Sequence, residues 1–584
     1  MTPRPVTEMR YAEILSAHRA HPLATAARSY GVRVLSNISV APLKEILELE
    51  LWTHGVPAQV SFGGYDTIIQ DSLAPTQASA DIVFWELANG SEGLASRAAC
   101  MTSGELADLE AKITHDLDFL FRNLHTRPFV LLNRFSATLF SPSAVEKSPL
   151  EDLADRLNDH VAKHKPDNLL LVDIEKCIAD VSMPRAVDWR RWSSARLLYT
   201  TDFLRSYATK VCPVFNTLNG RARKVLIFDC DNTLWDGVLG EDGFDGIGLD
   251  PTSARGCPFI DVQRLALSLQ KRGVLIGLCS KNNPEDVAEV VSSHPQMVLR
   301  DEHIAIRRVN WNNKVDNIRE IARALNVGLD SIVFVDDSDF EASLVESLLP
   351  EVMVVRVPPQ REQYPQTMRQ CRDAFWSSGA TKEDRERTTL YRQQAQRVDE
   401  AAGFSDMGGY LKSLALTMTV YANVAAQTGR MSQLTQKTNQ FNLTTRRYSE
   451  AQVSQLLASG DHTVFTFGLS DRFGDLGITG LAIVGVDPSD PALADIDSFL
   501  LSCRALGRGA EQKFLAHVLR TLSDRGIVAV TACYVPTSKN VQTLSFFDDS
   551  GFEIVREAAG RRDYRLELRR YEPKDPAYIQ LNRG

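Results

Sequence analysis

The chain has 584 residues, of which 44% are hydrophobic and 24% are charged, and its formal net charge is −9. This length exceeds what one hydrophobic core usually holds and predicts about three to four domains of about 150 residues each. The acidic balance, without a block of basic residues, argues against a nucleic-acid-binding protein, because the phosphate backbone would repel such a surface.

The sequence also lacks the patterns of export and membrane insertion. Residues 1–20 do not contain the apolar stretch of a signal peptide, and no apolar run approaches the roughly 20 residues that span a bilayer. Nine cysteines are spread along the chain without a Cys-x-x-Cys pair, so neither a zinc ribbon nor a disulfide framework is indicated. We therefore expect a cytoplasmic protein with reduced thiols and no membrane or nucleic-acid partner.

The first segment, residues 1–220, alternates apolar runs of strand length with helical stretches. This alternation predicts a parallel sheet with helices on both faces. The expected strands are 32–35, 81–85, 129–133 and 169–172, and the expected helices include 42–54 and 104–123.

The second segment, residues 221–375, repeats the alternation more regularly and predicts another α/β domain. Its expected elements are strands 224–228, 274–278 and 331–335 and helices 259–272 and 313–325.

The third segment, residues 376–584, begins with a polar stretch at 381–400 that we interpret as a connecting helix. Short strands then surround one long helix, which predicts an α/β domain of a different arrangement. The expected strands are 416–421, 464–467, 481–486 and 527–534, and the helix is 511–523. The predicted fold class is thus multidomain α/β.

A buried strand at 224–228 ends in Asp229-Cys-Asp-Asn-Thr233, with two carboxylates two residues apart. Open α/β sheets bind their ligands at the carboxyl ends of strands, and a carboxylate pair there suits Mg²⁺. We predict that Asp229 attacks phosphorus, while Asp231 protonates the leaving oxygen and later activates water. Such a pair also occurs as a helix cap or turn, so the motif alone does not decide.

Polar groups follow the next predicted strands as well. Ser280 offers a hydroxyl to a phosphoryl oxygen, and Lys314, at the start of a helix, can neutralise a transferring phosphate. Asp336 and Asp337 end a third strand and add carboxylates at the same sheet edge. Lys314 alone would more often be a solvated helix lysine. One aspartate alone could be a helix N-cap, although two are explained less readily in this way. The ordered combination of all these residues is specific.

This constellation resembles the haloacid dehalogenase (HAD) superfamily of phosphatases and phosphotransferases. The resemblance implies a nucleophilic Asp229, an acid/base Asp231, and Mg²⁺ held by Asp229, Asp336, Asp337 and the backbone carbonyl of Asp231. The short interval between the first two motifs implies a minimal cap and a site open to a bulky partner. The phosphate-binding residues implied by the resemblance are Thr233, Ser280, Lys281, Asn282 and Lys314.

Residues 231–243, 280–283, 433–445 and 499–511 are similar to the FkbH-like proteins of polyketide assembly lines, and the match extends over nearly the whole chain. The resemblance implies a small phosphorylated three-carbon substrate, 1,3-bisphosphoglycerate, from which phosphate is removed. It also implies delivery of a glyceryl group to the phosphopantetheine thiol of an acyl carrier protein. One departure is the motif Asp336-Asp-Ser-Asp-Phe-Glu341, where many relatives have Asp-Asp-Asn-Pro, which leaves the role of Glu341 open.

The run Arg504-Ala-Leu-Gly-Arg-Gly-Ala510 precedes the long helix, and free amides at a helix start bind anions. It is similar to the pyrophosphate-binding loop of GNAT acetyltransferases, and residues 546–552 are similar to a late GNAT motif. A Gly-x-Gly turn alone is more often only a tight turn. The phosphopantetheine-binding residues implied by the resemblance are Arg504, Leu506, Gly507, Arg508, Gly509, Ala510 and Asn540.

Two cysteines are candidates for carrying an acyl group. Cys503 directly precedes this loop, and Cys230 lies between the two catalytic aspartates, where carboxylates disfavour a thiolate. We rank Cys503 first, although either side chain could simply be buried. The polar side chains of a nearby run could bind a polyol or its phosphate, namely Gln433, Lys437, Asn439, Gln440 and Asn442.

Residues 1–220 resemble an SGNH hydrolase but lack its signature: Ser36 has no evident histidine base, and the late motif is Asp188-Trp-Arg-Arg191. We predict a non-hydrolytic domain. Three hypotheses follow for the chain: a bifunctional phosphatase and glyceryl transferase, a plain HAD phosphatase, or a non-catalytic scaffold. The intact aspartate, serine and lysine set favours an enzyme.

Overall fold

The computed structural model describes residues 5–25, 29–91, 93–141, 143, 145–377, 387–391, 393, 397, 406–487, 489–537 and 539–584. The chain divides into two compact units. The first comprises Met1–Asn219 with Tyr448–Gln455, and the second comprises Gly220–Arg447 with Leu456–Gly584. No helix within the described residues has both the length and the apolar character to cross a membrane.

The first unit is built on a parallel sheet with strand order β2-β1-β3-β4-β5. The predicted strands are confirmed. Edge strand β2 was not predicted. Its side chains alternate between buried and exposed only at the start of the strand, so the two-residue pattern is short. The strands are β1 (Tyr30–Ser36), β2 (Ala58–Tyr65), β3 (Ala80–Phe84), β4 (Val130–Asn133) and β5 (Leu169–Val172).

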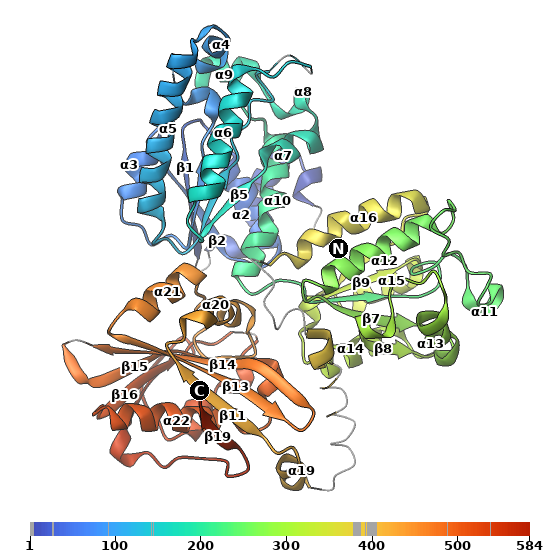
Figure 1. Cartoon of the computed structure of the whole chain (residues 1–584), viewed down its shortest axis with the longest axis vertical. Coiled ribbons are helices and arrows are strands. Elements are labelled where there is room, and N and C mark those ends of the chain that lie inside the picture. The colour runs from blue at the N-terminus through green and yellow to red at the C-terminus, as the bar shows by residue number, and fades with distance from the viewer. Residues whose placement is uncertain are drawn as a thin grey trace. The chain divides into compact units, whose positions relative to one another are not determined.

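Helices cover both faces of this sheet (Figure 1). Helices α5 and α6 pack on the strand residues Leu35, Val83 and Leu132, and α10 places aromatic side chains against Phe84 on the other face. Ser36 donates a hydrogen bond to the carbonyl of Phe84 (3.0 Å). The helices are α1 (Tyr11–Ala20), α2 (Leu43–Thr53), α3 (Ile68–Leu73), α4 (Leu94–Arg97), α5 (Ser103–Leu124), α6 (Pro149–His164), α7 (Ile174–Val181), α8 (Met183–Ala186), α9 (Trp189–Ala195) and α10 (Thr201–Leu218).

The second unit contains a second parallel sheet, in the order β10-β9-β6-β7-β8. All strands predicted for this segment are confirmed, and β8 and β10 extend the sheet at its edges. The strands are β6 (Val225–Phe228), β7 (Leu275–Ser280), β8 (Ile304–Val309), β9 (Ile332–Asp336) and β10 (Met353–Arg356).

Alternate side chains of these strands enter two cores, as the two-residue period of a strand requires. Leu226 and Phe228 face the core with α12 and α16, whereas Val225 and Ile227 face the core with α14 and α15. The helices are α11 (Leu239–Asp242), α12 (Cys257–Gln270), α13 (Pro284–Ser293), α14 (Lys314–Ala324), α15 (Asp339–Leu348) and α16 (Tyr364–Cys371).

A third, mostly antiparallel sheet follows, in the order β17-β18-β16-β15-β14-β13-β11-β19, with β12 attached to β15. Helix α22 packs its apolar face on this sheet through Phe514, Leu515 and Val518. Of the predicted connecting helix 381–400, residues 387–391, 393 and 397 are helical, and the rest lies outside the described residues. The elements are α19 (Met407–Ser413), β11 (Thr417–Ala422), α20 (Thr428–Lys437), β12 (Phe441–Asn442), α21 (Glu450–Ala458), β13 (His462–Asp471), β14 (Gly474–Asp487), β15 (Asp490–Leu501), α22 (Ala510–Asp524), β16 (Ala529–Tyr534), α23 (Phe546–Asp549), β17 (Glu553–Ala558), β18 (Arg561–Glu567) and β19 (Gln580–Arg583).

Candidate functional site

The order of the second sheet places three strand ends at one crevice. Strand β6 lies between β9 and β7, so the chain crosses to one side of β6 through β7 and to the other through β9. Ligands of open α/β sheets bind at such a switch point, outside the carboxyl ends of the strands. Asp229 follows β6, Ser280 ends β7 and Asp336 ends β9.

Three carboxylates converge there. One oxygen from each of Asp229, Asp336 and Asp337 lies within 4.8 Å of the others. The ammonium group of Lys314, the first residue of α14, lies 3.0 Å from an Asp229 oxygen and 2.6 Å from an Asp336 oxygen. Asp229, Asp336 and Lys314 are buried, so these charges interact with little screening from solvent.

The electrostatics of this cluster fit a divalent cation. Burial and the adjacent Asp229 raise the pKa of Asp336 to about 6 and also raise the pKa of Asp337. Burial alone would lower the pKa of Lys314, but Asp229 and Asp336 raise it above its usual value. The carboxylates outnumber the lysine, and closely spaced carboxylate oxygens are the ligands that Mg²⁺ prefers.

Asp231 is held apart from this cluster by hydrogen bonds. Its carboxylate accepts from Trp235 Nε1 (3.0 Å), the Leu239 backbone amide (3.1 Å) and Asn282 Nδ2 (2.9 Å). Burial nevertheless raises the pKa of Asp231, the direction of shift that a carboxyl group needs to donate a proton. Its side chain therefore does not belong to the group of three converging carboxylates, and its predicted acid/base role stays a prediction.

The expected phosphate-binding residues fall into two groups. Ser280 is buried at the end of β7, and Thr233 Oγ1 is a buried hydroxyl without a hydrogen-bond partner in the part of the chain that the structure describes. A phosphoryl oxygen would satisfy such a hydroxyl. Lys281 instead forms an ion pair with Glu341 at 2.6 Å, which gives Glu341 a positioning role that its sequence left open.

A second constellation surrounds a cavity of about 340 Å³ in the same unit. Within the described residues, the cavity is lined by six basic side chains and by one carboxylate, that of Asp330. Asp330 forms an ion pair with Lys539. Cys503 also lines this cavity. The basic side chains are Lys224, Arg387, Arg430, Lys437, Arg504 and Lys539.

The two candidate thiols have different surroundings. Cys503 is partly exposed, and its Sγ lies 3.5 Å from the hydroxyl of Tyr391. Cys230 is buried in the apolar core beneath β6, and burial raises the pKa of its thiol well above its usual value. A protonated, enclosed thiol is a poor nucleophile, so the geometry favours Cys503.

Most of the polar residues that were predicted between 433 and 442 line the same cavity as Cys503. Four of its five candidate residues line the cavity: Gln433, Lys437, Asn439 and Gln440. Asn442 is buried instead, where its amide donates to the carbonyl of Thr438 and accepts from the amide of Thr445.

The glycine-rich loop is more enclosed than its sequence suggested. Gly507 and Gly509 both adopt φ of 75°, and a Cβ atom at Gly509 would lie 2.6 Å from the hydroxyl of Tyr578. Arg508 is buried with its guanidinium 3.6 Å from Asp471. Among the described residues of this loop, Arg504 lines the cavity, whereas Leu506, Gly507, Arg508, Gly509 and Ala510 do not.

The chain itself fills the opening between β15 and β16. These strands pair in parallel only at Leu493–Ile496 and Ala529–Ala532 and then separate. Strand β12 pairs with the end of β15, and the Leu443 carbonyl accepts from the amide of Val535. Asn540 is fully buried and bonds to this segment and its own turn, so it supports the fold and presents no group to a ligand.

Sequence reasoning missed several members of both constellations. Trp235 and Leu239, which hold Asp231, follow the aspartate motif closely, but an indole and a backbone amide carry no catalytic signature. Lys224 looks like the start of a strand, and only the folded chain brings it to Cys503 and Tyr391.

No protein-family model and no curated protein matches the sequence. Among solved structures, the chain is similar to the N-terminal part of the protein BF1531 from Bacteroides fragilis, which contains a phosphatase domain and is complexed with Mg. The identity is 23% and the TM-score 0.55, and the alignment covers 64% of this chain and 100% of that one. At this identity the similarity establishes a shared α/β fold.

Two acetyltransferase structures overlap smaller parts of the chain. A putative GNAT-family acetyltransferase from Desulfovibrio desulfuricans has 22% identity and a TM-score of 0.18 over 20% of this chain and 79% of its own. The putative acetyltransferase yncA from Salmonella typhimurium, with acetyl-CoA, has 15% identity and a TM-score of 0.21 over 27% of this chain and 99% of its own. These scores do not establish a shared fold.

Proposed function

We propose that the chain is a Mg²⁺-dependent phosphatase coupled to an acyl transferase, as in FkbH-like proteins. In this proposal, 1,3-bisphosphoglycerate supplies a glyceryl group that reaches the phosphopantetheine thiol of an acyl carrier protein. The sheets would belong, in chain order, to a non-hydrolytic SGNH-like domain, a HAD-like domain with a minimal cap, and a GNAT-like domain. One observation carries the proposal: a single compact unit contains both the carboxylate crevice at Asp229 and a thiol in a basic cavity.

At the crevice, an Asp229 oxygen attacks the phosphorus of a phosphate ester. The bond to the leaving alcohol breaks, and Asp231 gives that oxygen a proton. Water then attacks the aspartyl phosphate, Asp231 takes its proton, and phosphate leaves. Mg²⁺, bound by Asp229, Asp336 and Asp337, would neutralise charge on the transferring phosphoryl group, and Lys314 would assist.

At the cavity, the sulfur of Cys503 attacks the acyl carbon of the acyl phosphate. The bond from carbon to the phosphate oxygen breaks, that oxygen keeps the electron pair, and the thiol proton passes to the departing inorganic phosphate, which produces a thioester. The basic side chains that line the cavity favour a substrate with two phosphate groups and stabilise the departing anion. The sulfur of the carrier thiol then attacks the thioester carbon, the bond from carbon to Cys503 sulfur breaks, and the proton passes to Cys503, which leaves as the thiol.

Intact-protein mass spectrometry tests both halves. The full chain is incubated with Mg²⁺ and a system that generates 1,3-bisphosphoglycerate, with and without a phosphopantetheinylated carrier protein. The proposal expects an acyl adduct on the chain that moves to the carrier. Phosphate release without an adduct on either protein would leave a plain phosphatase, and neither product would leave a scaffold.

A further inference from the structure

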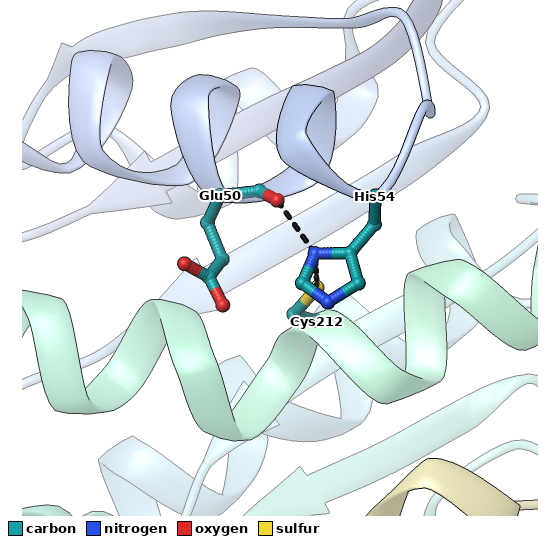
Figure 2. A group of neighbouring side chains, drawn as sticks. All are labelled: Glu50, His54 and Cys212. Carbon is teal, nitrogen blue, oxygen red and sulfur yellow. Dashed lines mark hydrogen bonds between the residues drawn. The ribbon is translucent and has the colours of Figure 1, made fainter. Parts of the chain in front are cut away.

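Three metal-ligating side chains meet where α2 packs against α10 in the first unit (Figure 2). Glu50 lies on α2, His54 is the C-cap residue of that helix, and Cys212 lies on α10. One ligand atom from each lies within 4.8 Å of the others. Residues four apart on a helix project from the same face, which explains why Glu50 and His54 reach the same point.

One ring nitrogen of His54 contacts the backbone of α2 and the sulfur of Cys212. Its Nδ1 lies 2.9 Å from the backbone carbonyl of Glu50 and 3.6 Å from the sulfur of Cys212. Donation from Nδ1 to the carbonyl leaves Nε2 with its lone pair exposed. Metal-bound histidines commonly donate their second ring nitrogen to a carbonyl in this manner, which fixes the tautomer and the ring plane.

The charge of Glu50 is compensated in part by His54 and by the side chain of Thr209. Glu50 is buried, and within the described residues it forms no ion pair with a lysine or arginine. Asn216, one turn after Cys212 on α10, donates its amide nitrogen to the Cys212 sulfur (3.4 Å). Its buried Oδ1 has no hydrogen-bond partner in the described part of the chain. A bound cation would offset the cost of a buried carboxylate and an orphaned amide oxygen.

We propose that Glu50, His54 and Cys212 form a Zn²⁺ site that fastens α2 to α10. A thiolate, an imidazole and a carboxylate together suit Zn²⁺, whereas Mg²⁺ and Ca²⁺ take oxygen ligands. Binding releases the thiol proton of Cys212 to solvent and forms a bond from sulfur to zinc. The fourth tetrahedral position is left for water or, after rotation of its amide, Asn216 Oδ1.

The test measures zinc retained by the full chain. The protein is loaded with Zn²⁺ in excess Mg²⁺, desalted and measured by mass spectrometry of its metal content, and its affinity is determined against a chromophoric chelator. The expected result is one zinc ion per chain, with affinity reduced at least about 100-fold in His54→Gln, because a direct ligand contributes more than an outer-shell group. Substitution with Co²⁺ should give a thiolate charge-transfer band that Cys212→Ser loses.

His125→Gln is the matched control for His54→Gln. His125 is also exposed at a helix C-cap, and its Nδ1 also lies near a backbone carbonyl, that of Arg122 (2.6 Å). Cys177→Ser controls for the loss of a buried thiol in the same unit. The proposal is overturned if the wild type retains no zinc, if His54→Gln and His125→Gln retain it equally, or if Asp336→Asn removes it.

Discussion

Lys224 and Asp229 stand at opposite ends of β6, the central strand of its sheet. Lys224 precedes the strand and lines the cavity with Cys503, whereas Asp229 follows the strand and joins the carboxylate crevice. Ser331 and Asp336 repeat this relationship on β9. Five residue steps of about 3.3 Å separate the two ends of β6 by roughly 16 Å.

This separation assigns the two phosphates of the proposed substrate to different places. The acyl phosphate would be opened at the cavity, and the phosphate ester would be hydrolysed at the crevice. A group bound to Cys503 cannot reach Asp229 without movement along the sheet. A phosphopantetheine arm is long enough to make that transfer, so the proposed carrier protein would link the two steps.

The first prediction is that Asp229→Asn traps a phosphorylated acyl group. Without its nucleophile, hydrolysis of a simple phosphate ester should fall at least about 1,000-fold, because attack by the carboxylate is the chemical step. Cys503 should still form a thioester, and the acyl group that reaches the carrier protein should keep the phosphate that the wild type removes. Intact-protein mass spectrometry distinguishes the two masses.

Asp245→Asn, at an exposed aspartate, is the control for Asp229→Asn and should behave as the wild type. An Asp229→Asn adduct without phosphate would contradict the assignment of the two phosphates to opposite ends of β6.

The second prediction concerns which cysteine carries the acyl group. Cys503→Ala should reduce acyl-enzyme and acyl-carrier formation at least about 100-fold, because no other thiol lies in the same position. Its phosphate-ester hydrolysis should stay within about twofold of the wild type, because Asp229 and Lys314 are untouched. Cys533→Ala, at another partly exposed cysteine, should change neither activity. An adduct that persists in Cys503→Ala would assign the acyl group elsewhere.

The third prediction concerns Mg²⁺. Asp337→Asn removes one of three converging oxygens and should weaken Mg²⁺ affinity at least about tenfold in isothermal titration calorimetry. Chelation of the metal should abolish phosphatase activity in the wild type. Thioester formation at Cys503 should survive chelation, since no step at the cavity uses the carboxylates. Equal Mg²⁺ affinity in Asp337→Asn and Asp245→Asn would exclude Asp337 as a ligand.

The carboxylate crevice could be predicted from sequence because local patterns position each member. Asp229, Ser280 and Asp336 directly follow or end apolar strands, and Lys314 starts an amphipathic helix. Strand order then brings these points together by a general rule of parallel sheets. The ion pair of Lys281 with Glu341 did not follow from the sequence, and phosphate binding by Lys281 stays a prediction.

Only part of the cavity could be predicted, namely Cys503, Arg504 and four polar residues between 433 and 440, and the proposed zinc site could not be predicted at all, because its members share no local pattern. Lys224, Tyr391 and Cys503 are far apart in sequence and meet only when two sheets pack in one unit. Strand β12 is two residues long, below the length at which alternation is detectable. Glu50 and Cys212 lie on helices that are far apart in the sequence of the first unit, and neither residue stands in a recognisable metal-binding motif.

The fourth prediction tests the structural role of Asn540. Asn540→Ala leaves the carbonyls of Asn442 and Val535 without their buried donor and should lower the free energy of unfolding by about 2–4 kcal/mol. Urea denaturation measures the loss, with the exposed Asn582→Ala as control. At a temperature where the variant is folded, acyl transfer to the carrier should stay within about twofold of the wild type. A selective loss of transfer would instead indicate contact with phosphopantetheine.

The last prediction follows from the charge on Lys224. Lys224 is half-buried in the wall of the cavity, and burial, reinforced by Arg387, lowers the pKa of its ammonium from 10.5 to about 7. Between these two values the unfolded chain holds a proton that the folded chain has released, so the stability of the folded state should increase as the pH rises through this window. Urea midpoints between pH 7 and pH 9 should rise in the wild type and rise less in Lys224→Gln. Lys271→Gln, at an exposed lysine of the same unit, should retain the full increase. If Lys224→Gln showed the same slope as the wild type, the Lys224 side chain would be charged in the folded protein, and the cavity would carry one more positive charge at neutral pH.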